Sequence, residues 1–291
     1  MSKLKAKDPS TAEPSKPKCV IFGKSGAGKT WFSLSFPNVY LIAPEDGANR
    51  AHYTERLKAG GGVYLGTEDG ALDFETVIDQ VKALATEKHQ FKTLVIDSVT
   101  KLFNNAVANE AERLGDKNAF GADKKPAVAF MRRLVSAISR LDMNVILVCH
   151  EKAEWGQDDK GQRVEIGQVP DCWDKLIYEL DLSIQVSKRG KSRYGIVRKS
   201  RLLGFPEGES FVLDYDTFAE RYGKDVIEKQ VKTLTLCTKE QADEIKRLVD
   251  LLKIDSATVD KWKEKASAET IEDFNTDQAA KIIESLKAKI K

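Results

Sequence analysis

The sequence has few cysteines, no long apolar run and almost no net charge. Its four cysteines, Cys19, Cys149, Cys172 and Cys237, lie far apart and form no C-x-x-C pair, which disfavours a zinc site and gives no disulfide framework. No stretch reaches 18 consecutive apolar residues and no signal-peptide core is present, so we expect a soluble cytoplasmic protein without membrane association. Because 47 Lys and Arg nearly balance 45 Asp and Glu, attraction to nucleic acid must come from local patches.

Apolar, β-branched segments alternate with amphipathic segments over much of the 291-residue chain. The strand-like segments are 19–22, 38–43, 62–66, 93–97, 144–149 and 182–186. Helical spacing of apolar residues is clearest over 74–86, 99–114 and 126–141. This alternation predicts an α/β fold with a mostly parallel central sheet covered by helices. Shorter segments at 193–200 and 210–216 predict an antiparallel extension of that sheet.

The pattern divides the chain into a polar tail over 1–18, a core over 19–226 and a helical C-terminal module over 227–291. In the module, Thr238 and Gln241 have the spacing of a capping box. An apolar stripe follows at Ile245, Leu248, Val249 and Leu252. With Trp262 and Phe274, these residues predict a small separate core. DNA contact, partner docking and capping of the larger core are all open as its role.

Residues 23–30 read GKSGAGKT and follow the apolar segment CVIF. The spacing fits G-x-x-x-x-G-K-[ST] between a strand-like and a helix-like segment. Backbone N–H groups of such a loop wrap nucleotide phosphates, its lysine reaches the β- and γ-phosphates, and its threonine hydroxyl ligates Mg²⁺. We therefore expect ATP and Mg²⁺ here, the alternative being a glycine-rich turn without chemical function. The expected nucleotide-binding residues are Gly23, Lys24, Ser25, Gly26, Ala27, Gly28, Lys29 and Thr30.

Three strand-like segments end in polar residues that complete this site. Asp97 ends TLVID and is expected to hold Mg²⁺, directly or through a water, unless it caps the next helix. Glu45, in VYLIAPE, is expected to orient the attacking water, the alternative being an acidic turn before Gly47. His150 follows NVILVC and is expected to sense the γ-phosphate, unless it merely closes the strand. We predict that the catalytic set is Glu45, Lys29, Asp97 and His150.

The order of these motifs resembles the RecA recombinase core. LIAPEDGA is similar to the RecA segment that carries its catalytic glutamate, TLVIDSVTKL to its second nucleotide motif, and NVILVCHEK to the strand before its second DNA-binding loop. The resemblance covers about residues 19–222 and extends to the phage RecA-like single-strand annealing proteins of the Sak type, which are minimal AAA-family ATPases. One departure is that His150 and Glu151 stand where RecA has an Asn-Gln pair.

The resemblance implies an ATPase that binds single-stranded DNA and works with a single-strand DNA-binding protein. It further implies that the protein promotes annealing or strand exchange in phage recombination, as a homo-oligomer in a ring or a filament.

The segment 187–201 holds seven cations and no acid, which creates a local anion site unless it is only a solvated hairpin face. The residues expected to face DNA phosphates are Lys188, Arg189, Lys191 and Arg193. The candidates for a finger that reaches a neighbouring subunit's γ-phosphate are Arg198, Lys199 and Arg201.

Two polar loops, 115–126 and 152–167, each carry an aromatic residue that can stack on an unpaired base. These residues are Phe120 and Trp155, and the alternative is that each ring folds onto the domain. The basic residues of these loops that we expect at DNA are Lys124, Lys125, Lys152, Lys160 and Arg163.

Together these features predict a Mg²⁺-ATP-dependent protein that binds single-stranded DNA and hydrolyses ATP faster in its presence. One alternative is another RecA-core ATPase, such as a helicase or a helicase loader. A second is a nucleotide-gated DNA-binding protein with negligible hydrolysis. A small-molecule kinase is disfavoured because no lid arginines are evident.

Overall fold

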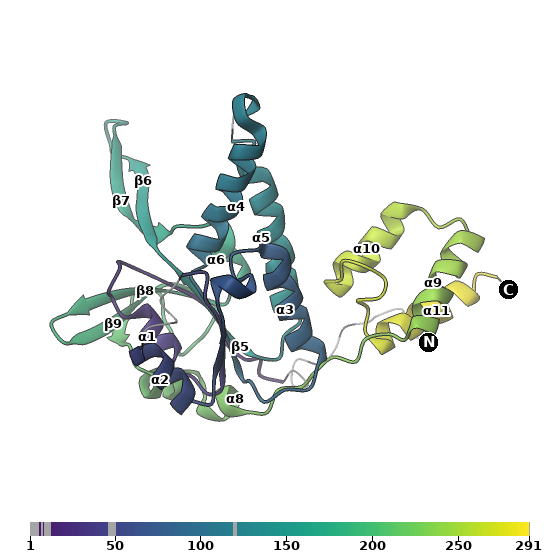
Figure 1. Cartoon of the computed structure of the whole chain (residues 1–291), viewed down its shortest axis with the longest axis horizontal. Coiled ribbons are helices and arrows are strands. Elements are labelled where there is room, and N and C mark those ends of the chain that lie inside the picture. Colours follow the sequence, from purple (N-terminus) through teal and green to yellow (C-terminus); the bar gives the residue numbers. More distant parts are fainter. Residues whose placement is uncertain (1–5, 7, 9–12, 46–50, 119–120, 291) are drawn as a thin grey trace.

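Eight strands form one central sheet in this computed structural model, which describes residues 6, 8, 13–45, 51–118 and 121–290 (Figure 1). The strand order is β10-β9-β8-β1-β5-β4-β2-β3. The strands are β1 Lys18–Phe22, β2 Val39–Ile42, β3 Val63–Leu65, β4 Thr93–Asp97, β5 Asn144–Cys149, β8 Leu182–Arg189, β9 Ser192–Ser200 and β10 Ser210–Val212. Neighbours from β3 to β8 are parallel, whereas β9 and β10 are added antiparallel. The expected parallel sheet with an antiparallel extension is confirmed.

Both faces of the sheet are buried, because successive side chains of each strand point to opposite sides. In β1, Val20 and Phe22 belong to one apolar core, and Cys19 and Ile21 belong to the other. The first core packs against α3 Phe74–Thr86, α4 Val99–Leu114 and α5 Lys124–Ser139. The second packs against α1 Lys29–Ser33, α2 Ala51–Ala59, α7 Tyr215–Tyr222 and α8 Lys224–Glu228. Helices therefore cover both faces and leave the strand ends for chemistry.

The helices begin where the sequence supplies caps. Asp73 accepts a hydrogen bond from the Thr76 N–H before α3, and Ser98 accepts one from the Lys101 N–H before α4. The expected helices over 74–86 and 99–114 are confirmed. The third expected helix, 126–141, begins two residues earlier in the structure and ends at Ser139.

The polar segment over 152–167 is not a loop but most of a β-hairpin. Strands β6 Glu151–Gln157 and β7 Arg163–Pro170 pair antiparallel and project from the core as a ribbon (Figure 1). Its strands carry few β-branched residues and many charged ones, so the sequence does not show the apolar alternation that predicts a strand. The turn DDKG at 158–161 was the available signal, since Asp and Gly favour tight turns. A short helix, α6 Leu176–Glu179, connects this hairpin to β8.

The N-terminal tail and the core are not separated at residue 18. Lys16 is 3% exposed, and its Nζ donates to the main-chain oxygens of Ile227 and Lys229 at 3.3 and 2.5 Å. Burial lowers the pKa of this lysine. The Pro17 carbonyl accepts from the Val145 N–H, so the hydrogen bonding between β1 and β5 already begins at residue 17. At the other boundary, Ile227 is fully buried in the core, so the core continues through α8, beyond the expected end at residue 226.

The C-terminal module contains three helices with a small core of their own. They are α9 Lys239–Leu251, α10 Ser256–Ala266 and α11 Thr276–Lys287. The expected capping box of Thr238 and Gln241 is present. Ile245, Phe274 and Ala279 form the buried centre, and Trp262 packs against it.

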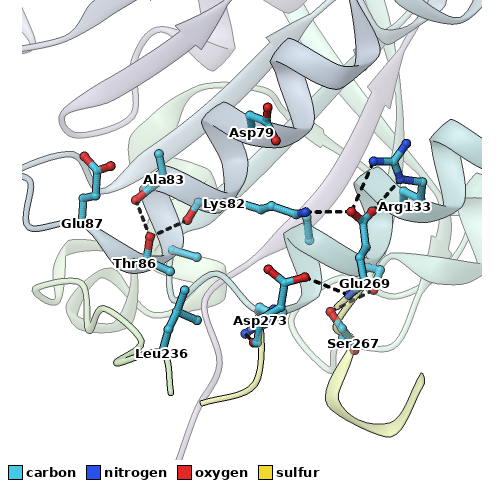
Figure 2. A pocket seen from close by; sticks show the side chains of 14 residues that line it. Asp79, Lys82, Ala83, Thr86, Glu87, Arg133, Leu236, Ser267, Glu269 and Asp273 are labelled. Carbon is cyan, nitrogen blue, oxygen red and sulfur yellow. Dashed lines mark hydrogen bonds and ion pairs between the residues drawn. The ribbon is translucent and has the colours of Figure 1, made fainter. Parts of the chain in front are cut away.

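An ion-pair network around Glu269 joins this module to α3 and α5 (Figure 2). Glu269 accepts from Lys82 Nζ at 2.7 Å and from Arg133 Nε at 2.5 Å, and Arg133 also pairs with Glu75 at 2.6 Å. Hydrogen bonds from Arg133, and then from Lys82, lower the pKa of Glu269 to about 2. A cavity of about 310 Å³ remains beside the network, between α3, α5 and the segment 267–273. We interpret this seam as the docking site of the module.

No helix among the described residues is long and apolar enough to cross a membrane.

Candidate nucleotide site

The loop after β1 has the backbone conformation of a phosphate cradle. Gly23 and Gly28 have φ of +153° and +99°, where residues with a side chain are strained. A Cβ on Gly23 would also lie 2.5 Å from the Val186 carbonyl oxygen, so the loop passes against β8 with no room for a side chain. Both glycines are therefore required by the backbone path of this loop.

Lys29 is held over this loop without an acidic partner. It is 8% exposed, and its Nζ donates to the carbonyl oxygens of Gly23 and Lys24 at 2.6 and 2.9 Å. Burial lowers the pKa of this lysine, while the nearby carboxylates of Asp97 and Glu45 oppose the shift. None of the ion pairs found in the described part of the chain includes Lys29. A buried ammonium that donates to loop carbonyls and makes no direct ion pair fits a site for an anion.

The Thr30 hydroxyl and Asp97 meet at the start of α1. Thr30 Oγ1 donates to Asp97 Oδ2 at 2.5 Å. Burial raises the pKa of Asp97 to about 6, against the hydrogen bond from Thr30. Because Ser98, not Asp97, caps α4, the capping alternative for Asp97 is wrong. A hydroxyl and a carboxylate in contact are oxygen ligands of the kind Mg²⁺ prefers, so the pair fits that metal.

Glu45 is oriented by residues from two neighbouring strands. Its Oε1 accepts from Ser98 Oγ at 2.5 Å and lies 2.8 Å from His150 Nε2. These residues follow β2, β4 and β5, which are adjacent in the sheet, so three strand ends converge on one edge. The main-chain N–H of His150 donates to Thr100 Oγ1 at 2.9 Å, which fixes the backbone at this strand end.

Sequence reasoning missed Ser98 and Thr100 as parts of this network. Both lie within three residues after Asp97, in the segment DSVT at 97–100, where capping of the following helix is already a sufficient role for the serine. That Ser98 also reaches Glu45 becomes visible only when β2 is known to lie beside β4 in the sheet.

A cavity of about 460 Å³ opens at this edge of the sheet, lined by residues 23–25, Glu45, His150 and the first residues of β6. The arrangement can bind and orient a polyphosphate through the loop amides and Lys29. Glu45 can accept a proton from a water in this cavity, and its hydrogen bonds fix where that water must lie. Mg²⁺, when bound, supplies charge neutralisation at the phosphate oxygens.

The cations of segment 187–201 do not form one cluster. Lys188, Arg189 and Lys191 are exposed around the β8–β9 turn, with Arg189 5.3 Å from the ring centre of Tyr194. Arg193, expected to face DNA, instead lies against Gly28 of the phosphate loop.

The three finger candidates lie at the far end of β9. Lys199 Nζ donates to the Leu180 carbonyl and Arg201 to the Tyr178 carbonyl, so both are engaged within their own chain. Arg198 is exposed, and no hydrogen bond or ion pair from its guanidinium is found among the described residues.

The remaining candidates for DNA contact lie on the projecting elements. Lys124 and Lys125 are exposed in the first turn of α5, and Phe120 lies outside the described residues. On the β6–β7 hairpin Trp155 is 52% exposed, with the Arg163 guanidinium 4.6 Å from its ring centre. Lys160 is exposed, whereas Lys152 pairs with Asp174 at 2.8 Å. Residues 151–170 hold five acids and three bases, so this ribbon attracts phosphates less than the β8–β9 turn does.

The phosphate loop, the Thr30–Asp97 pair and the strand-end carboxylate Glu45, on a sheet of this order, define a P-loop ATPase with a RecA-like fold. A model of the AAA domain matches residues 15–212, and the chain therefore belongs to that family.

Two solved structures are similar to the chain. The RadB recombinase is 17% identical, with a TM-score of 0.43 over 67% of this chain and 86% of that one. A prototypical ATPase from the type III secretion system of pathogenic bacteria is 14% identical, with a TM-score of 0.41 over 95% of this chain and 82% of that one. No curated protein matches the sequence.

Proposed function

We propose that this ATPase binds Mg²⁺-ATP at residues 23–30 and uses it to act on single-stranded DNA, promoting annealing or strand exchange in phage recombination. The observation that carries the ATP part is the convergence of Glu45, Asp97 and His150 on the phosphate loop from three adjacent strands. In this proposal Thr30 and Asp97 hold Mg²⁺, Glu45 activates the water, and His150 senses the γ-phosphate through Glu45.

The DNA part is supported by the exposed cations of the β8–β9 turn. Lys188, Arg189 and Lys191 lie at the end of β8 that is next to the phosphate loop, because β8 runs parallel to β1. Lys124, Lys125 and the exposed ring of Trp155 add cations and a stacking surface on the neighbouring projections. A strand bound here would lie close to the nucleotide.

We also propose that the protein assembles as a homo-oligomer, in a ring or a filament, and works with a single-strand DNA-binding protein. The assembly part is supported by Arg198, which is exposed and makes no hydrogen bond or ion pair among the described residues, so its guanidinium is available to a neighbouring subunit. Particle size by light scattering, with and without ATP, tests this part.

The central experiment compares ATP hydrolysis with and without a single-stranded oligonucleotide, for the wild type and Lys29→Ala. We expect stimulation by DNA and loss of nucleotide binding in the variant. The affinity for the oligonucleotide should fall with salt with a log-log slope of about −3, for about four neutralised phosphates. Wild-type protein that takes up no ATP in the presence of magnesium would refute the proposal, and a flat salt response would refute the role of the basic turn.

A nucleotide-gated binding protein with negligible hydrolysis is the second candidate, favoured by one contact. Glu45 Oε1 already interacts with both Ser98 and His150, so this oxygen is occupied by side chains of the protein itself rather than free to accept from a water. Single-turnover hydrolysis with DNA present separates the two functions. ATP-driven unwinding of a tailed duplex would instead identify a helicase.

A further inference from the structure

Arg193 carries a charge for which its own chain provides no partner. A Cβ built on Gly28 would lie 2.0 Å from Arg193 Nε and 2.4 Å from its Cδ, so the side chain rests directly on the phosphate loop. Arg193 Nε is shielded from solvent and has no hydrogen-bond partner. Within the described ranges, no ion pair or hydrogen bond to this guanidinium occurs. A buried, unpaired donor is unfavourable, which points to an acceptor that is bound at this place.

The register of the β8–β9 hairpin explains how Arg193 reaches the loop. Arg193 pairs with Lys188, and Gly195 pairs with Val186, so these four residues share one face of the hairpin. Val186 on that face belongs to the same apolar core as Ala27 of the loop. The hairpin therefore lays one face on the phosphate loop, with Arg193 over Gly28.

This position separates Arg193 from the two roles that its sequence neighbours suggest. A finger that acts in trans must reach away from its own phosphate loop, whereas Arg193 rests on Gly28. A residue of the exposed basic turn must present its guanidinium to solvent, whereas Arg193 is only partly exposed and its Nε is shielded.

We propose that Arg193 is an additional phosphate-binding residue of the nucleotide site in the same chain. It binds a nucleoside di- or triphosphate, with its guanidinium donating to phosphate oxygens beside Gly28. An arginine suits this task because its charge is permanent and its donors fit phosphate geometry. The inference rests on the proposed function, since it requires a nucleotide at residues 23–30.

The test is calorimetric titration of ATP and of ADP, each with MgCl₂, into the full chain. Arg193→Ala should weaken binding of both by roughly 10- to 100-fold, the range for a hydrogen bond to a charged group. Arg193→Lys should recover part of the loss, because it keeps the charge but not the fork. Arg113→Ala, which removes an exposed arginine on α4 that pairs with Glu110, is the matched control and should bind as the wild type does.

Two further measurements keep the outcomes distinct. The melting temperature of nucleotide-free Arg193→Ala should equal or exceed that of the wild type, because the variant loses an unsatisfied buried donor. Its affinity for an oligonucleotide without nucleotide should be unchanged. If Arg193→Ala binds ATP and ADP like Arg113→Ala, or loses only DNA affinity, the inference is wrong although the ATP site stands. If the wild type binds no nucleotide, the proposed function fails first.

Discussion

Replacing Asp97 by Asn should stabilise the nucleotide-free protein while impairing its metal site. Asp97 ends the buried strand β4 and is itself half-buried, with the Thr30 hydroxyl as its donor at 2.5 Å. Burial raises its pKa from 3.8 to about 6. Between these two values the folded state binds more protons than the unfolded state. The free energy of unfolding therefore falls as the pH rises through this window.

The size of the effect follows from the shift of the Asp97 pKa from 3.8 to about 6. At 1.36 kcal/mol per pKa unit, ionisation of Asp97 lowers the free energy of unfolding by about 3 kcal/mol at pH 8, where the carboxyl group is ionised in both the folded and the unfolded state. At pH 5 the folded state keeps its proton, and the cost is about half as large. Asparagine has nearly the same shape, carries no charge, and can still accept from Thr30. Asp97→Asn should therefore raise the melting temperature by several degrees at pH 8 and by about half as much at pH 5.

The assay is thermal unfolding in EDTA at both pH values, repeated at pH 8 with Mg²⁺-ATP. Ligand should shift the wild type upward but leave Asp97→Asn nearly unchanged, since the variant loses a metal ligand. Asp159→Asn, at the exposed turn of the β6–β7 hairpin, is the control and should melt as the wild type does. An Asp97→Asn protein no more stable than the wild type at pH 8 would refute the reasoning from burial.

Three further predictions concern other contacts of the chain. Glu45→Gln should still bind ATP but lose turnover by roughly 10²- to 10⁴-fold in a single-turnover assay; preserved turnover would remove Glu45 from its role. Gly28→Ala should weaken ATP binding and lower the melting temperature, because φ of +99° costs a residue with a side chain about 1 to 3 kcal/mol; wild-type behaviour would contradict the cradle. Glu269→Gln should weaken docking of the C-terminal module by about 1 to 2 kcal/mol, seen as faster tryptic cleavage between α8 and α9, with ATP affinity as the control. The contribution of the Glu269 carboxylate to the docking of the module should persist above pH 4.5 and be lost as the pH falls toward 2, because Arg133 holds the pKa of Glu269 in the folded state below its value in the unfolded state. Docking that does not depend on pH would argue against this contribution.

Local signals predicted the parallel core well because each has a local physical cause. A buried strand needs a continuous apolar run, and the phosphate loop needs glycines at positions of positive φ, so both are visible in the sequence. Strand ends of a parallel sheet meet at one edge, which is why Glu45, Asp97 and His150 could be assigned to one site before their contacts were known. The capping box at Thr238 and Gln241 was visible for the same local reason.

Contacts between segments distant in sequence could not be predicted in this way. Lys16 reads as part of a charged tail, yet its ammonium group binds carbonyls more than 200 residues away in α8 and after it. Ser98 reads as a helix cap, and its second role depends on β2 lying beside β4. The Glu269 network likewise depends on where the module docks.

The direction of β9 decides what the basic segment can do. In sequence, Arg193 and Arg201 belong to one run of cations, but β9 is antiparallel to β8, so it leaves the edge of the phosphate loop and ends at the opposite edge. Eight residues of extended chain place the two arginines about 26 Å apart. Arg193 therefore lies on the phosphate loop of its own chain, whereas Arg201 lies near the opposite edge and donates to the Tyr178 carbonyl. The proposed cis role of Arg193 and the proposed trans role of Arg198 are compatible, because the two residues lie five positions apart on the strand and only Arg193 rests on Gly28.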